Sequence, residues 1–129
     1  MPEAPASVSD IKITSFSTRS QLRGDALIVA LTGNADMAAH DQLKVFLEDL
    51  HRTAAGLGVR ETVLELQDLY FMNSSCLSLL LRLVNSVLQS KQSKYTVRFR
   101  LNPNLRWQKR SMDAIRSYAE DIVVIEQAL

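Results

Sequence analysis

The pattern of apolar and polar positions divides the chain into alternating strand-like and helix-like segments. Residues 26–31 are apolar at every position, as in a central strand that is buried on both faces. Residues 95–101 alternate apolar and polar side chains, which is typical of a strand with one buried face. Residues 38–56 and 74–89 repeat apolar side chains at helical spacing. Strands and helices that alternate in this way predict an α/β domain.

Shorter segments complete the predicted sheet. Arg23-Gly24-Asp25 has turn chemistry and predicts a hairpin before the central strand. A third helix is expected to follow Asn102-Pro103-Asn104 and to end near residue 119. Three further strands are expected at residues 11–16 (an edge strand), 61–66 and 122–125. We therefore expect a small mixed β-sheet of four to five strands with about three main helices.

The helix over residues 74–89 is apolar around an unusually wide arc. One stripe is expected to pack on the sheet, namely Leu77, Leu80, Leu81, Val84 and Leu88. Further apolar residues widen the arc to roughly 200°, namely Cys76, Leu79, Leu83 and Val87. Two explanations stay open: a neighbouring helix covers the excess, or part of it is exposed for a partner.

Composition favours a single cytoplasmic domain. Apolar residues make up 47% of the 129 residues and charged residues 22%, with a net charge of +1. One cysteine excludes an internal disulfide and any cysteine-rich metal site. No apolar run approaches the roughly 18 residues that span a membrane. The first residues lack the features of a signal peptide, so we expect residues 1–9 to be a mobile tail and 10–129 the domain.

The trio Asn73-Ser74-Ser75 opens the second predicted helix. Such side chains satisfy the free N–H groups of a first helical turn. The trio also places two hydroxyls at a positively polarised helix end. A phosphoryl group there would add roughly two negative charges at one point of the surface. From local chemistry alone, a simple cap and a phosphorylation switch both stay open.

The surrounding sequence resembles the signature of the STAS domain, the family of bacterial anti-sigma factor antagonists. In that family a strand ends in an apolar turn, Phe-Met-Asp-Ser-Ser-Gly-Leu, that leads into a helix, and residues 71–77 here read Phe-Met-Asn-Ser-Ser-Cys-Leu. A second match, at residues 31–36, is similar to the family's strand-ending Leu-Thr-Gly-x-x-Asp. The two matches have the family's order and spacing. The resemblance covers residues from about 10 to 126.

The resemblance implies a protein–protein switch without catalytic residues or cofactors. In the family, the unmodified domain binds a kinase-type anti-sigma factor. That kinase phosphorylates the serine corresponding to Ser74, and a metal-dependent phosphatase reverses the reaction. Ser75 is the alternative acceptor. The partner-binding surface is expected to comprise Gly33, Asn34, Asp36, Asn73, Ser74, Ser75 and Ser78.

Two residues depart from the family's pattern at this motif. Asn73 replaces the acidic residue before the serines, and Cys76 replaces the glycine after them. Asn caps a helix about as well as Asp, but a carboxylate and a bare patch of backbone are lost. An alternative function is therefore a scaffold that uses the same surface without phosphorylation.

No enzyme site assembles from the sequence. His40 and His51 lie at opposite ends of one helix, with His51 expected on its solvated side, and no glycine-rich phosphate loop is present. Cys76 near a helix N-terminus suggests a thiol sensor, although its position within the apolar arc favours a small buried side chain.

A basic segment suggests a third function, the binding of polyanions or nucleic acid. Only Asp113 opposes the cations, and Trp107 lies among them. A solvated helix face explains the pattern as well, and the low net charge makes nucleic acid an unfavoured partner. The segment's cations are Arg98, Arg100, Arg106, Lys109, Arg110 and Arg116.

Overall fold

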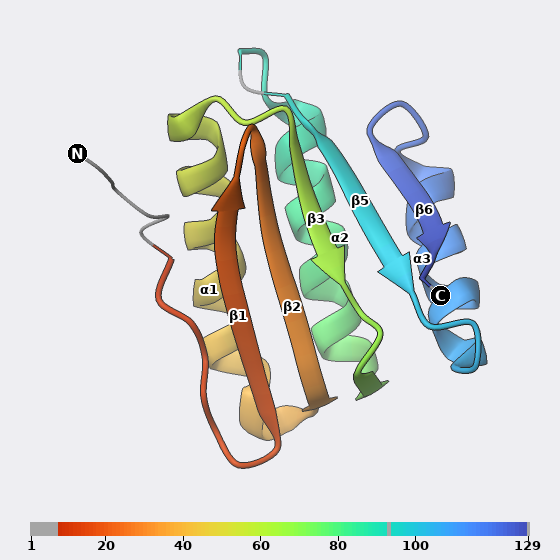
Figure 1. Cartoon of the computed structure of the whole chain (residues 1–129). Helices are drawn as coiled ribbons and strands as arrows, with labels where there is room; N and C mark the ends of the chain where they lie inside the picture. The colour runs from red at the N-terminus through yellow and green to blue at the C-terminus, as the bar shows by residue number, and fades with distance from the viewer. Residues whose placement is uncertain (1–7, 93, 129) are drawn as a thin grey trace.

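The computed structural model describes residues 8–92 and 94–128, which form one six-stranded sheet and three helices. Helices α1, α2 and α3 all lie behind the sheet in Figure 1, so they cover one of its faces. In chain order the elements are β1 (Phe16–Arg23), β2 (Ala26–Ala35), α1 (Met37–Leu57), β3 (Glu61–Glu65), β4 (Leu69–Met72), α2 (Ser74–Gln89), β5 (Thr96–Leu101), α3 (Arg106–Tyr118) and β6 (Val123–Gln127).

The sheet is mixed, with the order β1-β2-β3-β5-β6. β1 pairs antiparallel with β2 through the predicted hairpin turn, whereas β2, β3, β5 and β6 are parallel. β3 pairs with residues 26–30 of β2, and β4 pairs in parallel with residues 33–35 of the same strand. β4 thus continues the path of β3 along β2, after a break at residues 66–68. The α/β class, the mixed sheet and the three predicted helices are confirmed.

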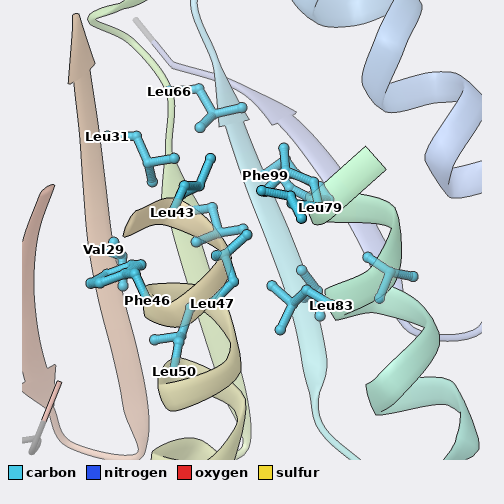
Figure 2. Packing of buried hydrophobic residues seen from close by; sticks show 14 of the residues in the cluster. Val29, Leu31, Leu43, Phe46, Leu47, Leu50, Leu66, Leu79, Leu83 and Phe99 are labelled. Carbon is cyan, nitrogen blue, oxygen red and sulfur yellow. The ribbon is translucent and has the colours of Figure 1, made fainter. Parts of the chain in front are cut away.

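The hydrophobic core lies between the helices and the covered face of the sheet. Figure 2 shows Phe46 of α1 packed toward Val29 of β2 and Leu79 of α2 beside Phe99 of β5, with Leu43 and Leu83 further along the same two helices. α1 packs along α2 as well as on β2. Of the two explanations left open for the wide apolar arc of α2, coverage by a neighbouring helix therefore holds for the side that faces α1.

The other face of the sheet carries a ladder of ion pairs. Arg98 of β5 bonds Glu61 and Glu126, each at 2.9 Å. Arg100, two residues later, bonds Glu126 at 2.6 Å and Glu65 at 3.0 Å. The hydrogen bond from Arg100 is the largest cause that lowers the pKa of Glu126 below its ordinary value. The ladder satisfies the charges of β3, β5 and β6 where no helix covers them.

Two predictions about the strands were wrong, and one residue of the predicted tail belongs to the core. The edge strand spans Phe16–Arg23 rather than 11–16, because the chain turns at 13–16, where Ile13 N–H donates to Phe16 C=O at 3.0 Å. The apolar segment expected as a turn before α2 contains strand β4, which raises the strand count to six. Residues 1–7 of the predicted tail lie outside the described residues, but Val8 packs in the core.

The buried side of α2 also differs from the predicted stripe. Leu81 is 38% exposed, and Leu77 and Leu88 are only partly buried. The burial is rotated toward α1, because α1 as well as the sheet covers this helix. The buried residues of α2 are Cys76, Leu79, Leu80, Leu83, Val84 and Val87.

Gly33 is required by the backbone near the end of β2. Its φ is +103°, and a Cβ atom at this position would lie 2.2 Å from the carbonyl oxygen of Ser15. The N–H of Gly33 donates to Asp68 C=O at 2.9 Å, and the N–H of Asn34 donates to Ser15 C=O at 2.7 Å. Gly33 therefore lets the turn before β1 approach the end of β2 closely.

We predict that Gly33→Ala lowers the free energy of unfolding by about 2 kcal/mol or more, because both the positive φ and the clash with backbone resist a side chain. Gly56→Ala is the matched control. Gly56 lies within α1 with open space around it, so alanine should be neutral or stabilise by up to about 1 kcal/mol. Urea unfolding followed by circular dichroism measures both values. An equal free energy of unfolding for the two variants would contradict the prediction and show that the backbone at Gly33 relaxes to accept a side chain.

Candidate partner-binding site

Two helix-capping loops meet at one edge of the sheet. Asp36 ends the loop after β2, and its Oδ1 accepts a hydrogen bond from the N–H of Ala38 in α1 at 3.0 Å. Asn73 follows β4, and its Oδ1 accepts from the N–H of Cys76 in α2 at 2.8 Å. Because β2 and β4 are paired and parallel, α1 and α2 both begin at the carboxyl edge of the sheet.

Direct bonds hold the two loops together. The N–H of Asn73 donates to the carbonyl of Ala35 at 3.0 Å. The Sγ of Cys76 donates to the carbonyl of Asp36 at 3.5 Å. The two sequence motifs, some 40 residues apart, are thus joined at adjacent backbone positions.

The predicted serines lie on the surface. Ser74 and Ser75, the first residues of α2, are both exposed. Ser78 is exposed one turn later, and its hydroxyl donates to the carbonyl of Ser74 at 3.1 Å. Among the upstream residues Asn34 is exposed, whereas Gly33 and Asp36 are partly buried. The exposed part of the predicted surface is therefore Asn34 with the three serines, while Gly33 and Asp36 shape its backbone.

Large apolar side chains at the same edge were missed by the sequence analysis. Met37, the first residue of α1, is 71% exposed, and Phe71 of β4 is 50% exposed. Phe71 pairs with Asn34 across the two strands, and Tyr70 beside it is also exposed. The signal for them in the sequence was the apolar run before the cap, residues 69–72. We call this surface the carboxyl-edge surface; it comprises Asn34, Met37, Tyr70, Phe71, Ser74 and Ser75.

A shallow groove continues from this surface between α2 and α3. Its α2 side includes Ser74, Leu77, Ser78 and Leu81. Its α3 side includes Arg110 and Tyr118, and no other charged residue of the described chain lines it. We call it the α2–α3 groove. No histidine, lysine or carboxylate lines it, so nothing within the groove activates a serine as a nucleophile.

Cys76 is a packing residue. Its side chain is fully buried in the core between α1, α2 and the sheet. Burial raises the pKa of the Cys76 thiol, and the nearby Asp36 carboxylate raises it further. The thiol sensor considered from the sequence needs the opposite shift and an accessible sulfur.

The basic segment does not form one patch. Arg98 and Arg100 lie in the ion-pair ladder on the open face of the sheet, opposite the helices. On α3, Lys109 pairs with Asp113 at 2.7 Å. The Trp107 indole N–H donates to the carbonyl of Tyr70 at 3.0 Å, which fixes the first turn of α3 against β4. Two of the six cations that suggested polyanion binding are therefore held on the opposite face of the sheet from Trp107 and the other four, which lie on α3.

The two histidines have structural partners. His51 is half-buried and its Nδ1 lies 2.8 Å from the Tyr95 hydroxyl, so its predicted place on the solvated side of α1 was wrong. Burial lowers the pKa of His51. His40 Nδ1 lies 3.2 Å from the neighbouring Asp41 carboxylate. Within residues 8–92 and 94–128, no metal-ligating side chains gather into a group. None of the three helices described there has the length and hydrophobicity of a membrane span.

Comparison with solved structures identifies the fold. A crystal structure of an anti-sigma factor antagonist from Mycobacterium paratuberculosis matches with a TM-score of 0.64 at 13% identity, over 85% of this chain and 86% of that one. The chain has the STAS-like fold of the anti-sigma factor antagonists. No family sequence model and no curated protein sequence matches it.

A second antagonist, SpoIIAA, matches in two states. Its unphosphorylated form gives a TM-score of 0.55 at 17% identity, over 87% of this chain and 89% of that one. The phosphorylated form of this Bacillus cell fate determinant gives 0.53 at 17% identity, over 87% and 91%. The STAS-like fold predicted from the two motifs is thereby confirmed.

We predict that Cys76 reacts slowly with a coloured aromatic disulfide in the native protein and fast in urea, because its sulfur is buried and its pKa is raised. A Cys76→Ala, Ser78→Cys double variant supplies the control, since position 78 is exposed on the same helix. That thiol should react fast without urea. Equal native rates for the two thiols would contradict the burial of Cys76.

Proposed function

We propose that this domain is a protein-binding switch of the anti-sigma factor antagonist type, controlled by phosphorylation of Ser74. The observation that carries the proposal is the junction of the two capping loops. It presents an exposed hydroxyl at the start of α2 beside exposed Met37 and Phe71. Exposed apolar groups rimmed by polar residues are typical of protein-binding surfaces.

The partner proposed is a kinase-type anti-sigma factor or a related serine kinase of the bacterial cytoplasm. The kinase would bind the carboxyl-edge surface and transfer the γ-phosphoryl group of ATP to a serine Oγ, releasing ADP and the hydroxyl proton. A metal-dependent phosphatase would hydrolyse the ester. The domain itself would act without catalysis, as the binding element of the switch.

Ser74 is the preferred acceptor over Ser75 for a geometric reason. Both hydroxyls are exposed, but Ser74 lies where the carboxyl-edge surface meets the α2–α3 groove. The cap bond uses the Asn73 side chain and the Cys76 N–H, so the Ser74 hydroxyl is not needed to begin the helix. A negative charge at a helix N-terminus also stabilises the helix, by roughly 0.3–1 kcal/mol. Phosphorylation should therefore leave the fold intact.

The effect of phosphorylation should fall on the interface. A dianion at Ser74 would have to lose water against a partner surface that fits a neutral hydroxyl. The structures of SpoIIAA in both states support the view that this fold can carry a phosphoryl group. The competing hypothesis is a constitutive scaffold, since Asn73 and Cys76 depart from the family's motif.

We predict that Phe71→Ser weakens capture of the partner kinase by about tenfold or more, because exposed aromatic residues often dominate binding energy. Leu57→Ser is the matched control: Leu57 is 47% exposed at the far end of α1. Calorimetric titration against each anti-sigma-type kinase from the same genome measures the affinity. Equal losses in the two variants would place the interface elsewhere.

We predict that Ser74→Asp stays folded and loses the partner, whereas Ser74→Ala stays folded and binds constitutively. Mass spectrometry of the protein from its own cells, with and without the kinase gene, identifies the modified serine. Ser75→Asp and Ser75→Ala are tested alongside. If neither serine is modified and Ser74→Asp binds normally, the scaffold hypothesis replaces the switch.

A further inference from the structure

The α2–α3 groove contains one uncompensated cation close to Ser74. Arg110 lines the groove together with Ser74, and no other charged residue of the described chain does so. The ion pairs of the described residues do not include Arg110, whereas its neighbour Lys109 is paired with Asp113. An anion formed in the groove would therefore meet a free guanidinium.

The register of the two helices places Arg110 about one turn beyond Ser74. α2 and α3 run in the same direction, since each begins at the carboxyl edge of the sheet (Figure 1). The Tyr118 hydroxyl donates to Asn85 Oδ1 at 2.6 Å, which sets the level of one helix against the other. Counting back eight residues from Tyr118 on α3 and eight from Asn85 on α2 places Arg110 level with Leu77. Ser74 lies three residues earlier, roughly 4.5 Å along the axis.

The direction of helical side chains closes this gap. Cα–Cβ bonds in a helix tilt toward its N-terminus, so the side chain of Arg110 starts toward the level of Ser74. Long side chains routinely reach across one helical turn, as ion pairs between residues four apart show. Arg106, one turn earlier on α3, lines a separate cavity with Lys109, Asn102 and Gln127.

We propose that Arg110 binds the phosphoryl group of phosphorylated Ser74 within the α2–α3 groove. The inference rests on the proposed modification of Ser74. A guanidinium can donate two parallel hydrogen bonds to phosphate oxygens, so the contact fixes the direction of the group as well as its charge. Phosphorylation then does two things at once: it adds a dianion, and it occupies the one arginine that lines the groove.

The test uses phosphoserine encoded at position 74 during translation, so it needs neither kinase nor partner. ³¹P NMR titration measures the second pKa of the phosphoserine, ordinarily about 6. We expect this pKa to be lower in the parent than in Arg110→Gln by about half a unit, the size of an exposed ion pair. Arg116→Gln is the matched control and should leave the pKa at the parent's value, because Arg116 is an exposed arginine in the last turn of α3 that does not line the groove.

Two further measurements keep the result decisive. Arg110→Lys should retain part of the shift, because it keeps the charge without the planar pair of donors. About 0.5 M salt should reduce the difference between parent and Arg110→Gln. The same pKa in parent and Arg110→Gln would overturn the contact. The assay contains no kinase, so it tests the contact separately from the proposed function. If the pKa of the phosphoserine shifts as expected but cells never phosphorylate the protein, the contact is confirmed and the proposed function is wrong.

Discussion

The pairing of β4 with the end of β2 is the constraint on which the candidate site depends. β4 has four residues and pairs with β2. Two backbone bonds bracket it, from Gly33 N–H to Asp68 C=O at 2.9 Å and from Asn73 N–H to Ala35 C=O at 3.0 Å. Without them, the loop that caps α2 would have no fixed position relative to the loop that caps α1. The close approach of Ser15 at Gly33 ties the start of β1 to the same edge.

The two departures from the family's motif have separate physical consequences. Asn73 keeps the capping bond to Cys76 N–H at 2.8 Å, so the helix begins as it would with an acidic cap but without the negative charge. Cys76 points into the core and is fully buried, where its side chain adds packing that a glycine could not supply. The first change alters the electrostatics beside Ser74, and the second stabilises the junction of the two loops.

The elements that the sequence predicted well are those with a long, regular pattern. The central strand was predicted from its continuous apolar run, and the helix at 74–89 from the helical spacing of its apolar residues. β4 was missed because its four residues are all apolar or aromatic, so the sequence shows no alternation of apolar and polar side chains. In the structure Tyr70 and Phe71 are both exposed. The strand geometry of β4 comes from pairing with β2, which no local pattern contains. The wide apolar arc of the helix at 74–89 likewise indicated that much of its surface is buried. It did not indicate that α1 is the element that covers one side of it.

The basic segment shows why neighbours in sequence need not share a surface. Arg98 and Arg100 alternate with buried residues of β5, so they point to the open face, where three glutamates neutralise them. The helices lie on the other face, and Arg110 there has no carboxylate in its groove. The fold thus compensates the charges of the sheet and leaves one cation near Ser74. Because the core and the caps do not use that cation, the local charge can be inverted by a phosphoryl group without a change in the packing that holds the domain together.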